Sequence, residues 1–253
     1  KLKVIKKIIK NMDFIIPLAG LVGAPLCEKK KKEAVNINVK AIELLISVAK
    51  KNQKIIYPTS NSGYGIGQKS KFCDENSPLN PISLYGRTKA EAEKIVMKHS
   101  NFVAFRLATI FGYSYRMRTD LIVNNFVEKA VKTKRLDIFE PKFRRNFIHI
   151  RDVVRAFIFS IENFKKVRNN IFNLGLSSAN ITKIQLAQKI KNNLKDTKIV
   201  VNRSKSDPDK RDYFVSNKKI EKAGFKAKIK LEEGIAELSN IFKNCDIKFN
   251  NNY

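Results

Sequence analysis

The order of short apolar runs and longer amphipathic stretches limits the fold of this chain more than any other sequence feature. Apolar runs typical of buried strands lie at 13–19, 54–60 and 101–110. Stretches with apolar residues at helical spacing lie at 28–50, 83–100 and 120–132. Strands that alternate with helices are typical of a parallel sheet covered on both faces. The sequence therefore predicts an α/β fold.

After residue 135 the expected elements become shorter. Short strands are expected at 136–139, 146–150, 170–174, 199–201 and 213–215, and helices at about 152–163, 182–194 and 231–243. This pattern predicts that 119–253 mainly form a smaller mixed α/β lobe. Residues 1–118 belong to the larger lobe, and about 146–175 are expected to return to it, so the two lobes are interleaved.

The composition restricts the class of protein. The 253 residues carry 51 Lys+Arg against 23 Asp+Glu, a net charge of +28. The basic residues are spread along the chain, which favours a compositional bias over a dedicated groove for a polyanion. No apolar run approaches the roughly 20 residues of a membrane helix. Three scattered cysteines fit neither a disulfide framework nor a metal site. We expect a cytoplasmic protein without a metal or membrane partner.

The sharpest local signal is the pair Tyr85 and Lys89, four residues apart in a predicted helix. This spacing places both side chains on one face, about one turn apart. A cation held near a phenol lowers the pKa of the phenol, which lets a tyrosine exchange a proton with a substrate hydroxyl. By itself such a pair also fits a half-buried aromatic residue beside a solvated amine.

A hydroxyl-rich segment lies at the carboxyl end of the strand predicted at 54–60. Thr59 and Ser60 end this strand, and Ser62, Tyr64 and Gly65 follow. Ligands of open α/β sheets bind at the carboxyl ends of the strands. The segment is therefore a candidate source of hydrogen-bond donors to a reacting oxygen, or otherwise a turn with local hydrogen bonds.

Seven segments in order carry a resemblance to a known family. They are Leu18-Ala19-Gly20 with Val22-Gly23-Ala24-Pro25, Asn36-Ile37-Asn38-Val39, Thr59-Ser60 with Tyr64-Gly65, Tyr85 to Lys89, Arg106 to Gly112, Arg145 to Val153 (RNFIHIRDV), and Arg211-Asp212-Tyr213 before Gly224-Phe225. The chain resembles the extended short-chain dehydrogenase/reductase superfamily, specifically the NAD-dependent nucleotide-sugar epimerases and dehydratases. The resemblance implies a Rossmann-like fold in which residues 1–118 belong to the NAD-binding domain and 119–253 to the substrate lobe.

The resemblance also implies roles for individual residues. Tyr85 exchanges a proton with the C4 hydroxyl of the sugar, Ser60 hydrogen-bonds the same oxygen, and Lys89 binds the ribose of the cofactor and lowers the pKa of Tyr85. The implied cofactor contacts are Leu18, Ala19, Gly20, Asn38, Tyr85, Lys89 and Ala108. The implied contacts to a nucleoside-diphosphate sugar are Asn124, Arg145 and Arg211. A homodimer is expected.

The residues after Ser60 favour one reaction of the family. The resemblance implies an Asp-Glu pair here in the dehydratases and a Glu in the decarboxylating relatives, whereas this chain has Asn61 and Ser62. Neither side chain exchanges protons near pH 7. The sequence therefore predicts a nucleotide-sugar epimerase that oxidises C4 transiently.

One departure from the family concerns the cofactor. The family opens with a strand, a Gly-rich turn and a helix that bind the pyrophosphate. Neither Gly20 to Gly23 nor Gly63 to Gly67 has that spacing, so we expect the chain to lack about two βα units, as a fragment or a truncated protein. The choice of NAD over NADP then rests on the resemblance alone. The alternative is an inactive protein of the same fold that binds RNA or another polyanion.

Overall fold

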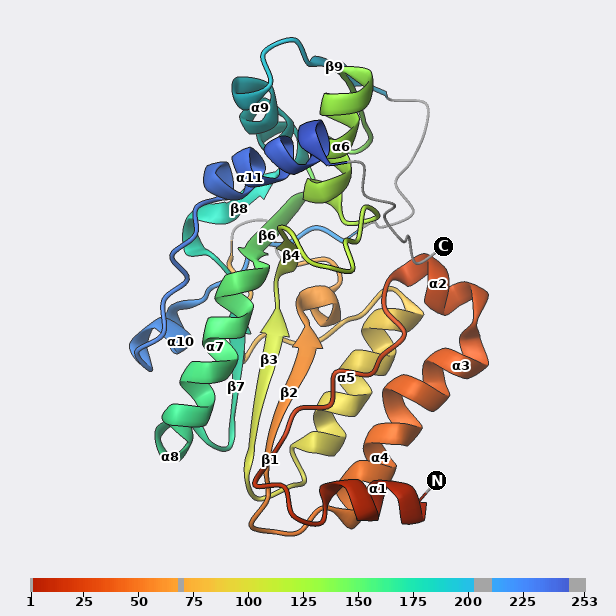
Figure 1. Cartoon of the computed structure of the whole chain (residues 1–253). Coiled ribbons are helices and arrows are strands. Elements are labelled where there is room, and N and C mark those ends of the chain that lie inside the picture. Colours follow the sequence, from red (N-terminus) through yellow and green to blue (C-terminus); the bar gives the residue numbers. More distant parts are fainter. Residues whose placement is uncertain (1, 68–70, 203–210, 246–253) are drawn as a thin grey trace.

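The computed structural model describes residues 2–67, 71–202 and 211–245. Its central sheet is parallel and has the strand order β1-β2-β3-β7 (Figure 1). The strands are β1 (Phe14–Ile15), β2 (Lys54–Ser60), β3 (Phe102–Leu107) and β7 (Asn170–Leu174). The predicted α/β fold with a parallel, Rossmann-like sheet is confirmed.

Helices cover both faces of the sheet. Side chains of β2 alternate between the two faces, so Ile56 joins one buried cluster and Ile55 another. Phe105 of β3 stacks on Phe157 of α7 (Ile150–Glu162), with ring centroids 5.6 Å apart. On the other face, Ile55 packs with Ala92 of α5 (Leu84–Val96). Figure 1 shows α5 and α7 on opposite sides of the strands.

The first predicted strand is much shorter than expected. Only Phe14 and Ile15 pair with β2, whereas 13–19 were expected. Pro17 has no N–H group to donate to a ladder. Further on, Asn38 binds both backbone groups of Leu21: its Oδ1 accepts from the N–H at 2.8 Å and its Nδ2 donates to the C=O at 2.9 Å. These side-chain bonds hold the segment after β1 against η1.

The long helix expected at 28–50 is broken into four pieces. They are α2 (Ala24–Lys29), α3 (Lys31–Val35), a π-helical turn η1 (Asn36–Lys40) and α4 (Ala41–Val48). Lys30 interrupts the helix with a non-helical φ of −120°. The π turn contains Asn38, the residue that binds Leu21. The break therefore serves a long-range contact that periodicity does not reveal.

The strand expected at 101–110 is divided between two sheets. After β3 the chain leaves the central sheet at Ala108 and enters β4 (Thr109–Phe111). β4 pairs in parallel with β6 (Arg144–His149), which pairs antiparallel with β8 (Asn180–Thr182). The residues 213–215 form no named strand, and instead Val215 makes a single bridge to Cys73.

The remaining elements surround these strands. They are α1 (Leu2–Ile9), the short turn η2 (Asn61–Tyr64), α6 (Ile122–Thr133), β5 (Arg135–Ile138), α8 (Phe164–Val167), η3 (Ser177–Ala179), α9 (Lys183–Asn193), β9 (Lys198–Val201), α10 (Lys218–Lys222) and α11 (Leu231–Asn244). The elements α1, α8, α10 and β8 were not expected. One buried cluster runs from Ile56 of the sheet to Leu238 of α11. The division into lobes at residue 118 stays a prediction.

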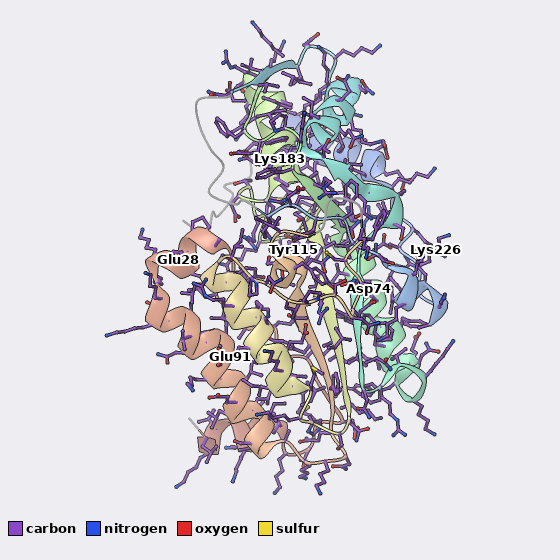
Figure 2. All side chains as sticks on the ribbon, turned by 180° about the vertical axis from the view of Figure 1, so that it is seen from behind. Glu28, Asp74, Glu91, Tyr115, Lys183 and Lys226 are labelled. Atoms are coloured by element: carbon purple, nitrogen blue, oxygen red, sulfur yellow. The ribbon has the colours of Figure 1, made fainter. Side chains whose placement is uncertain are left out.

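Among the described residues, no helix has the length and apolar character needed to cross a membrane. In the same part of the chain, no group of three or more His, Cys, Asp or Glu side chains is arranged to hold a metal ion. The cytoplasmic location and the homodimer stay predictions. Side chains ending in nitrogen project from every part of the ribbon, so positive charge is spread over the molecule (Figure 2).

Candidate active site

A cavity of about 610 Å³ lies where β2 and β3 end. Its wall includes the hydroxyl residues Thr59, Ser60, Ser62 and Tyr85 and the cationic residues Arg116, Arg118, Lys129, Arg145, Lys183 and Arg211. The carboxyl ends of β2 and β3 thus contribute to one pocket, as expected for an open α/β sheet.

Tyr85 lies in the first turn of α5. The helix begins after Ser83, whose Oγ accepts a hydrogen bond from Gly86 N at 3.1 Å. A Cβ atom at Gly86 would lie 2.9 Å from the carbonyl oxygen of Ser62, so glycine lets α5 approach η2 closely. The start of the helix therefore places Tyr85 beside Ser60 at the cavity wall.

The environment of Tyr85 acts on its pKa in two directions. Burial raises the pKa of the phenol. A hydrogen bond with Ser60 and the positive charges of Arg211 and Arg118 lower it. The two cations that favour ionisation of the phenol belong to the same cavity wall as Tyr85.

Lys89 binds strand β2. Its Nζ donates to the Tyr57 hydroxyl at 3.0 Å and to the Pro58 carbonyl oxygen at 2.6 Å. It also lies 4.4 Å from the centre of the Tyr57 ring. The spacing places Lys89 on the face of α5 expected for it, but burial requires partners for the ammonium group, and β2 supplies them. Burial also lowers the pKa of Lys89 to about 8.

Arg145 and Arg211 meet at the cavity. Arg145 is buried, and its Nη1 donates to the carbonyl oxygens of Arg144, at 2.9 Å, and of Arg211. The Nη1 of Arg211 donates to the Oγ of Ser62. Two guanidinium groups from distant segments therefore lie next to the Ser60–Tyr85 pair, as expected for residues that bind an anion.

Asn124 lines the same cavity, but backbone groups occupy its side chain. Its Oδ1 accepts from Gly112 N at 3.1 Å, and its Nδ2 donates to Arg118 O at 3.0 Å. The residue thereby fixes the segment that carries Arg118. Contact with a substrate, which the resemblance implies for Asn124, stays a prediction.

The comparisons with known proteins agree with this geometry. The model of the "NAD dependent epimerase/dehydratase family" matches residues 2–175. The chain belongs to this family. It is 26% identical to the mouse dTDP-D-glucose 4,6-dehydratase over 246 residues, which cover 90% of this chain and 66% of the length of that enzyme. It is 25% identical to a putative UDP-glucose 4-epimerase of Methanocaldococcus jannaschii, covering 93% of this chain and 78% of that protein.

A solved structure shows the same fold. UDP-glucuronic acid 4-epimerase from Bacillus cereus, in complex with UDP-glucuronic acid and NAD, superposes with a TM-score of 0.82 at 22% identity. The match covers 94% of this chain and 78% of that chain. At this identity the likeness establishes the fold, and the reaction of this family member is inferred from its own residues.

The cavity wall suits the nicotinamide end of the cofactor that the family uses. Ala24 and Pro25 of α2, Leu107 at the end of β3 and Ala108 after it contribute small or apolar side chains to the same wall as Tyr85. Such a surface fits a flat ring, because few polar groups there need to be satisfied. Lys89 is buried and does not belong to this wall, so its contact with the ribose stays a prediction.

The other residues expected to contact the cofactor have different positions. Ala108 is buried in the cavity wall. Leu18, Ala19 and Gly20 lie in the exposed segment after β1. Asn38 is buried and binds Leu21 and, at 3.1 Å, the Thr88 hydroxyl. Asn38 therefore joins that segment to α5, and the cofactor contacts of these four residues outside the wall stay predictions.

Sequence reasoning missed three residues of the site. Ser62 belongs to the hydroxyl-rich segment noted above and Tyr57 to the strand predicted at 54–60, but the contacts of these residues and of Arg118 were not predicted. Arg118 pairs with Asp120 through two hydrogen bonds, one of them Nε to Oδ1 at 3.1 Å. The alternation of β2 does not show which residue of α5 Tyr57 meets. No local signal identifies the partner of Ser62.

Proposed function

We propose that this protein is an NAD-dependent nucleoside-diphosphate-sugar 4-epimerase. The observation that carries the proposal is that Ser60 and Tyr85 share the wall of one cationic cavity. A phenol and a hydroxyl in contact suit the reversible removal of a proton from a sugar alcohol. The cations beside them suit a diphosphate.

Tyr85 takes the proton from the C4 hydroxyl of the sugar, and Ser60 holds the same oxygen by a hydrogen bond. When bound, NAD would supply the acceptor and the later donor of a hydride. The positive charges of Arg211 and Arg118 stabilise the phenolate form of Tyr85 against the effect of burial. Tyr85 would then return the proton to the same oxygen.

The carboxylates of the cavity wall are held in ion pairs, and this supports epimerisation over dehydration. Elimination of water from C5 and C6 needs a further acid and base. The described lining residues include the carboxylates Asp120 and Asp137, and each pairs with an arginine, Arg118 and Arg135 respectively. Asn61 and Ser62 cannot replace them, because an amide and an aliphatic hydroxyl do not titrate near neutral pH.

Asn61 has a second property that argues against a proton-transfer role. Its side chain is buried, and within the described residues neither polar atom of its amide has a hydrogen-bond partner. It is also absent from the cavity wall that Ser60 and Ser62 share. A residue in this position cannot deliver a proton to a sugar in the cavity.

The anionic part of the substrate would lie against Arg145 and Arg211. Guanidinium groups bind diphosphates through several directed N–H donors. The placement of both arginines within the same cavity as Tyr85 allows one ligand to contact all three. This arrangement supports a nucleoside-diphosphate sugar as the substrate class.

The test compares Tyr85→Phe with Tyr115→Phe in the full-length protein. Tyr115 is fully exposed and serves as the matched control. With UDP-, dTDP- and GDP-sugars, Tyr85→Phe should lower turnover by about 10²- to 10⁴-fold, and the control should match the wild type. Products separated by chromatography should be C4 epimers. A 4-keto-6-deoxy sugar as the product would replace the epimerase proposal by a dehydratase.

A further inference from the structure

Ser62 connects the two chemical parts of the cavity. Its Oγ accepts a hydrogen bond from Ser60 Oγ at 2.9 Å. The same oxygen accepts from the Nη1 of Arg211, which comes from a segment 149 residues further along the chain. One side chain thus joins the hydroxyl that contacts Tyr85 to the cation placed to bind the substrate anion.

The backbone around Ser62 has little freedom to move. Ser60 is the N-cap of η2, and its Oγ accepts from Ser62 N at 3.2 Å. On one side Gly86 of α5 packs against the carbonyl group of Ser62. At the other end of the turn, the Tyr64 hydroxyl accepts from Arg106 at 2.9 Å and lies 2.7 Å from Asn173 Oδ1. Contacts on both sides therefore fix the position of the Ser62 hydroxyl.

The guanidinium group of Arg211 is suited both to bind Ser62 and to bind an anion. It carries five N–H donors on three nitrogen atoms, so an N–H on Nη1 can bind Ser62 while other donors of the group face a ligand. A lysine at the same position would act as a point charge without this fixed fork. The contact with Ser62 therefore orients Arg211 and is compatible with anion binding.

We propose that Ser62 is a positioning residue that ties Arg211 to Ser60 and so sets the distance between the diphosphate and the reacting carbon. This proposal rests on the proposed function, because it takes Arg211 as a ligand of the diphosphate. Pre-organised groups bind more tightly, since less conformational freedom is lost on binding. Ser62 thereby affects both binding of the nucleoside diphosphate and the geometry of the oxidised carbon, without touching the reacting atoms itself.

Binding of nucleoside diphosphates tests the proposal without any turnover. Calorimetry would compare UDP, dTDP and GDP binding to the full-length wild type, Ser62→Ala, Ser62→Thr, Arg211→Lys and the double variant Ser62→Ala/Arg211→Lys. We expect Ser62→Ala to weaken binding about tenfold and Ser62→Thr, which keeps the hydroxyl, to stay within about twofold of the wild type. Adding Ser62→Ala to Arg211→Lys should cause little further loss, because both changes break one contact.

Turnover provides a second readout that a purely structural role would not produce. Ser62→Ala should lower kcat and raise KM together, whereas Ser60→Ala should lower kcat with little change in KM. Ser47→Ala is the control, because Ser47 is exposed on α4. Thermal unfolding of every variant checks that the fold is retained.

The outcomes separate this proposal from the proposed function. If the wild type binds a nucleoside diphosphate and Ser62→Ala binds it equally well, the role of Ser62 is refuted and the proposed function stands. Fully additive losses in the double variant also refute it. If the wild type binds none of the three nucleoside diphosphates, the substrate class is wrong, and the role of Ser62 is refuted with it.

Discussion

The ammonium group of Lys89 lies 3.0 Å from the hydroxyl of Tyr57, and this contact ties the middle of α5 to strand β2. A second hydrogen bond of 2.6 Å to Pro58 O strengthens the connection. Lys89 is 8% exposed, and its burial lowers its pKa to about 8. The residue is therefore charged at neutral pH but loses its charge within an accessible pH range.

The first prediction concerns pH. The ammonium form of Lys89 donates hydrogen bonds, and this form is lost as pH rises through about 8. We expect kcat of the wild type to fall as pH rises through this range, with the pH dependence of a single group that loses one proton. Lys89→Arg should move this fall to much higher pH, because a guanidinium stays charged. Steady-state rates between pH 6 and 10 provide the measurement, and an unchanged alkaline limb in Lys89→Arg would show that another group is responsible.

The second prediction concerns the stability cost of this lysine. Its folded pKa of about 8 lies below the ordinary value of 10.5, so the unfolded chain binds more protons between these two values. The free energy of unfolding therefore rises with pH between about 8 and 10.5. Below pH 8 the full cost of burying the charged lysine applies. Lys89→Met should raise the unfolding free energy at pH 7 by about 1–3 kcal/mol, and the gain should shrink toward pH 10.5.

Lys94→Met is the matched control for this measurement, because Lys94 is exposed on the same helix. Its effect should stay within about 0.5 kcal/mol at every pH. Urea unfolding at pH 7 and pH 10 gives both values. A Lys89→Met variant that is less stable than the wild type at pH 7 would mean that its hydrogen bonds outweigh the cost of burial.

The third prediction concerns the buried ion pair of Arg106 and Glu93. Three N–O contacts of 2.8 to 3.2 Å join the two side chains, which are 5% and 2% exposed. Glu93→Gln leaves the guanidinium buried without its counter-charge, and this should lower the unfolding free energy by about 3–5 kcal/mol. Glu91→Gln, at an exposed position of α5, should change it little. Chemical denaturation distinguishes the two, and equal effects would contradict the prediction.

The fourth prediction concerns the contact between Gly112 and His149. Gly112 has a φ of +109°, and a Cβ atom there would lie 2.4 Å from His149 Nε2. That nitrogen is 2.7 Å from Glu237 Oε2, so the ring has little room to move. Gly112→Ala should destabilise the fold by about 2–4 kcal/mol through backbone strain and overpacking.

Gly224→Ala separates these two causes. Gly224 has a φ of +108°, but its added Cβ would meet no atom closer than 3.5 Å. This variant should show the backbone cost alone, about 1–2 kcal/mol. Melting curves of the two variants give the difference, and a larger loss in Gly224→Ala would rule out the His149 clash as the main cause.

The sequence by itself determined the elements whose signals are local. The strand at 54–60 was predicted with its observed bounds, because every residue of it lies in one apolar run that ends in hydroxyl residues. The helix that carries Tyr85 was also predicted, at 83–100, because apolar residues recur there at helical spacing, and it runs from Leu84 to Val96. These local signals were enough to place Ser60 and Tyr85 at one end of the sheet.

Tertiary structure alone decided what the charged and polar side chains touch. Nothing near Ser62 in the sequence indicates that Arg211, 149 residues away, donates to it. The partner of Lys89 is likewise set by the packing of α5 on β2, and the contact of Asn38 with Leu21 joins residues 17 positions apart. Periodicity reports which face of an element is buried, whereas a hydrogen bond depends on the distance between two atoms. That distance exists only once the chain has folded.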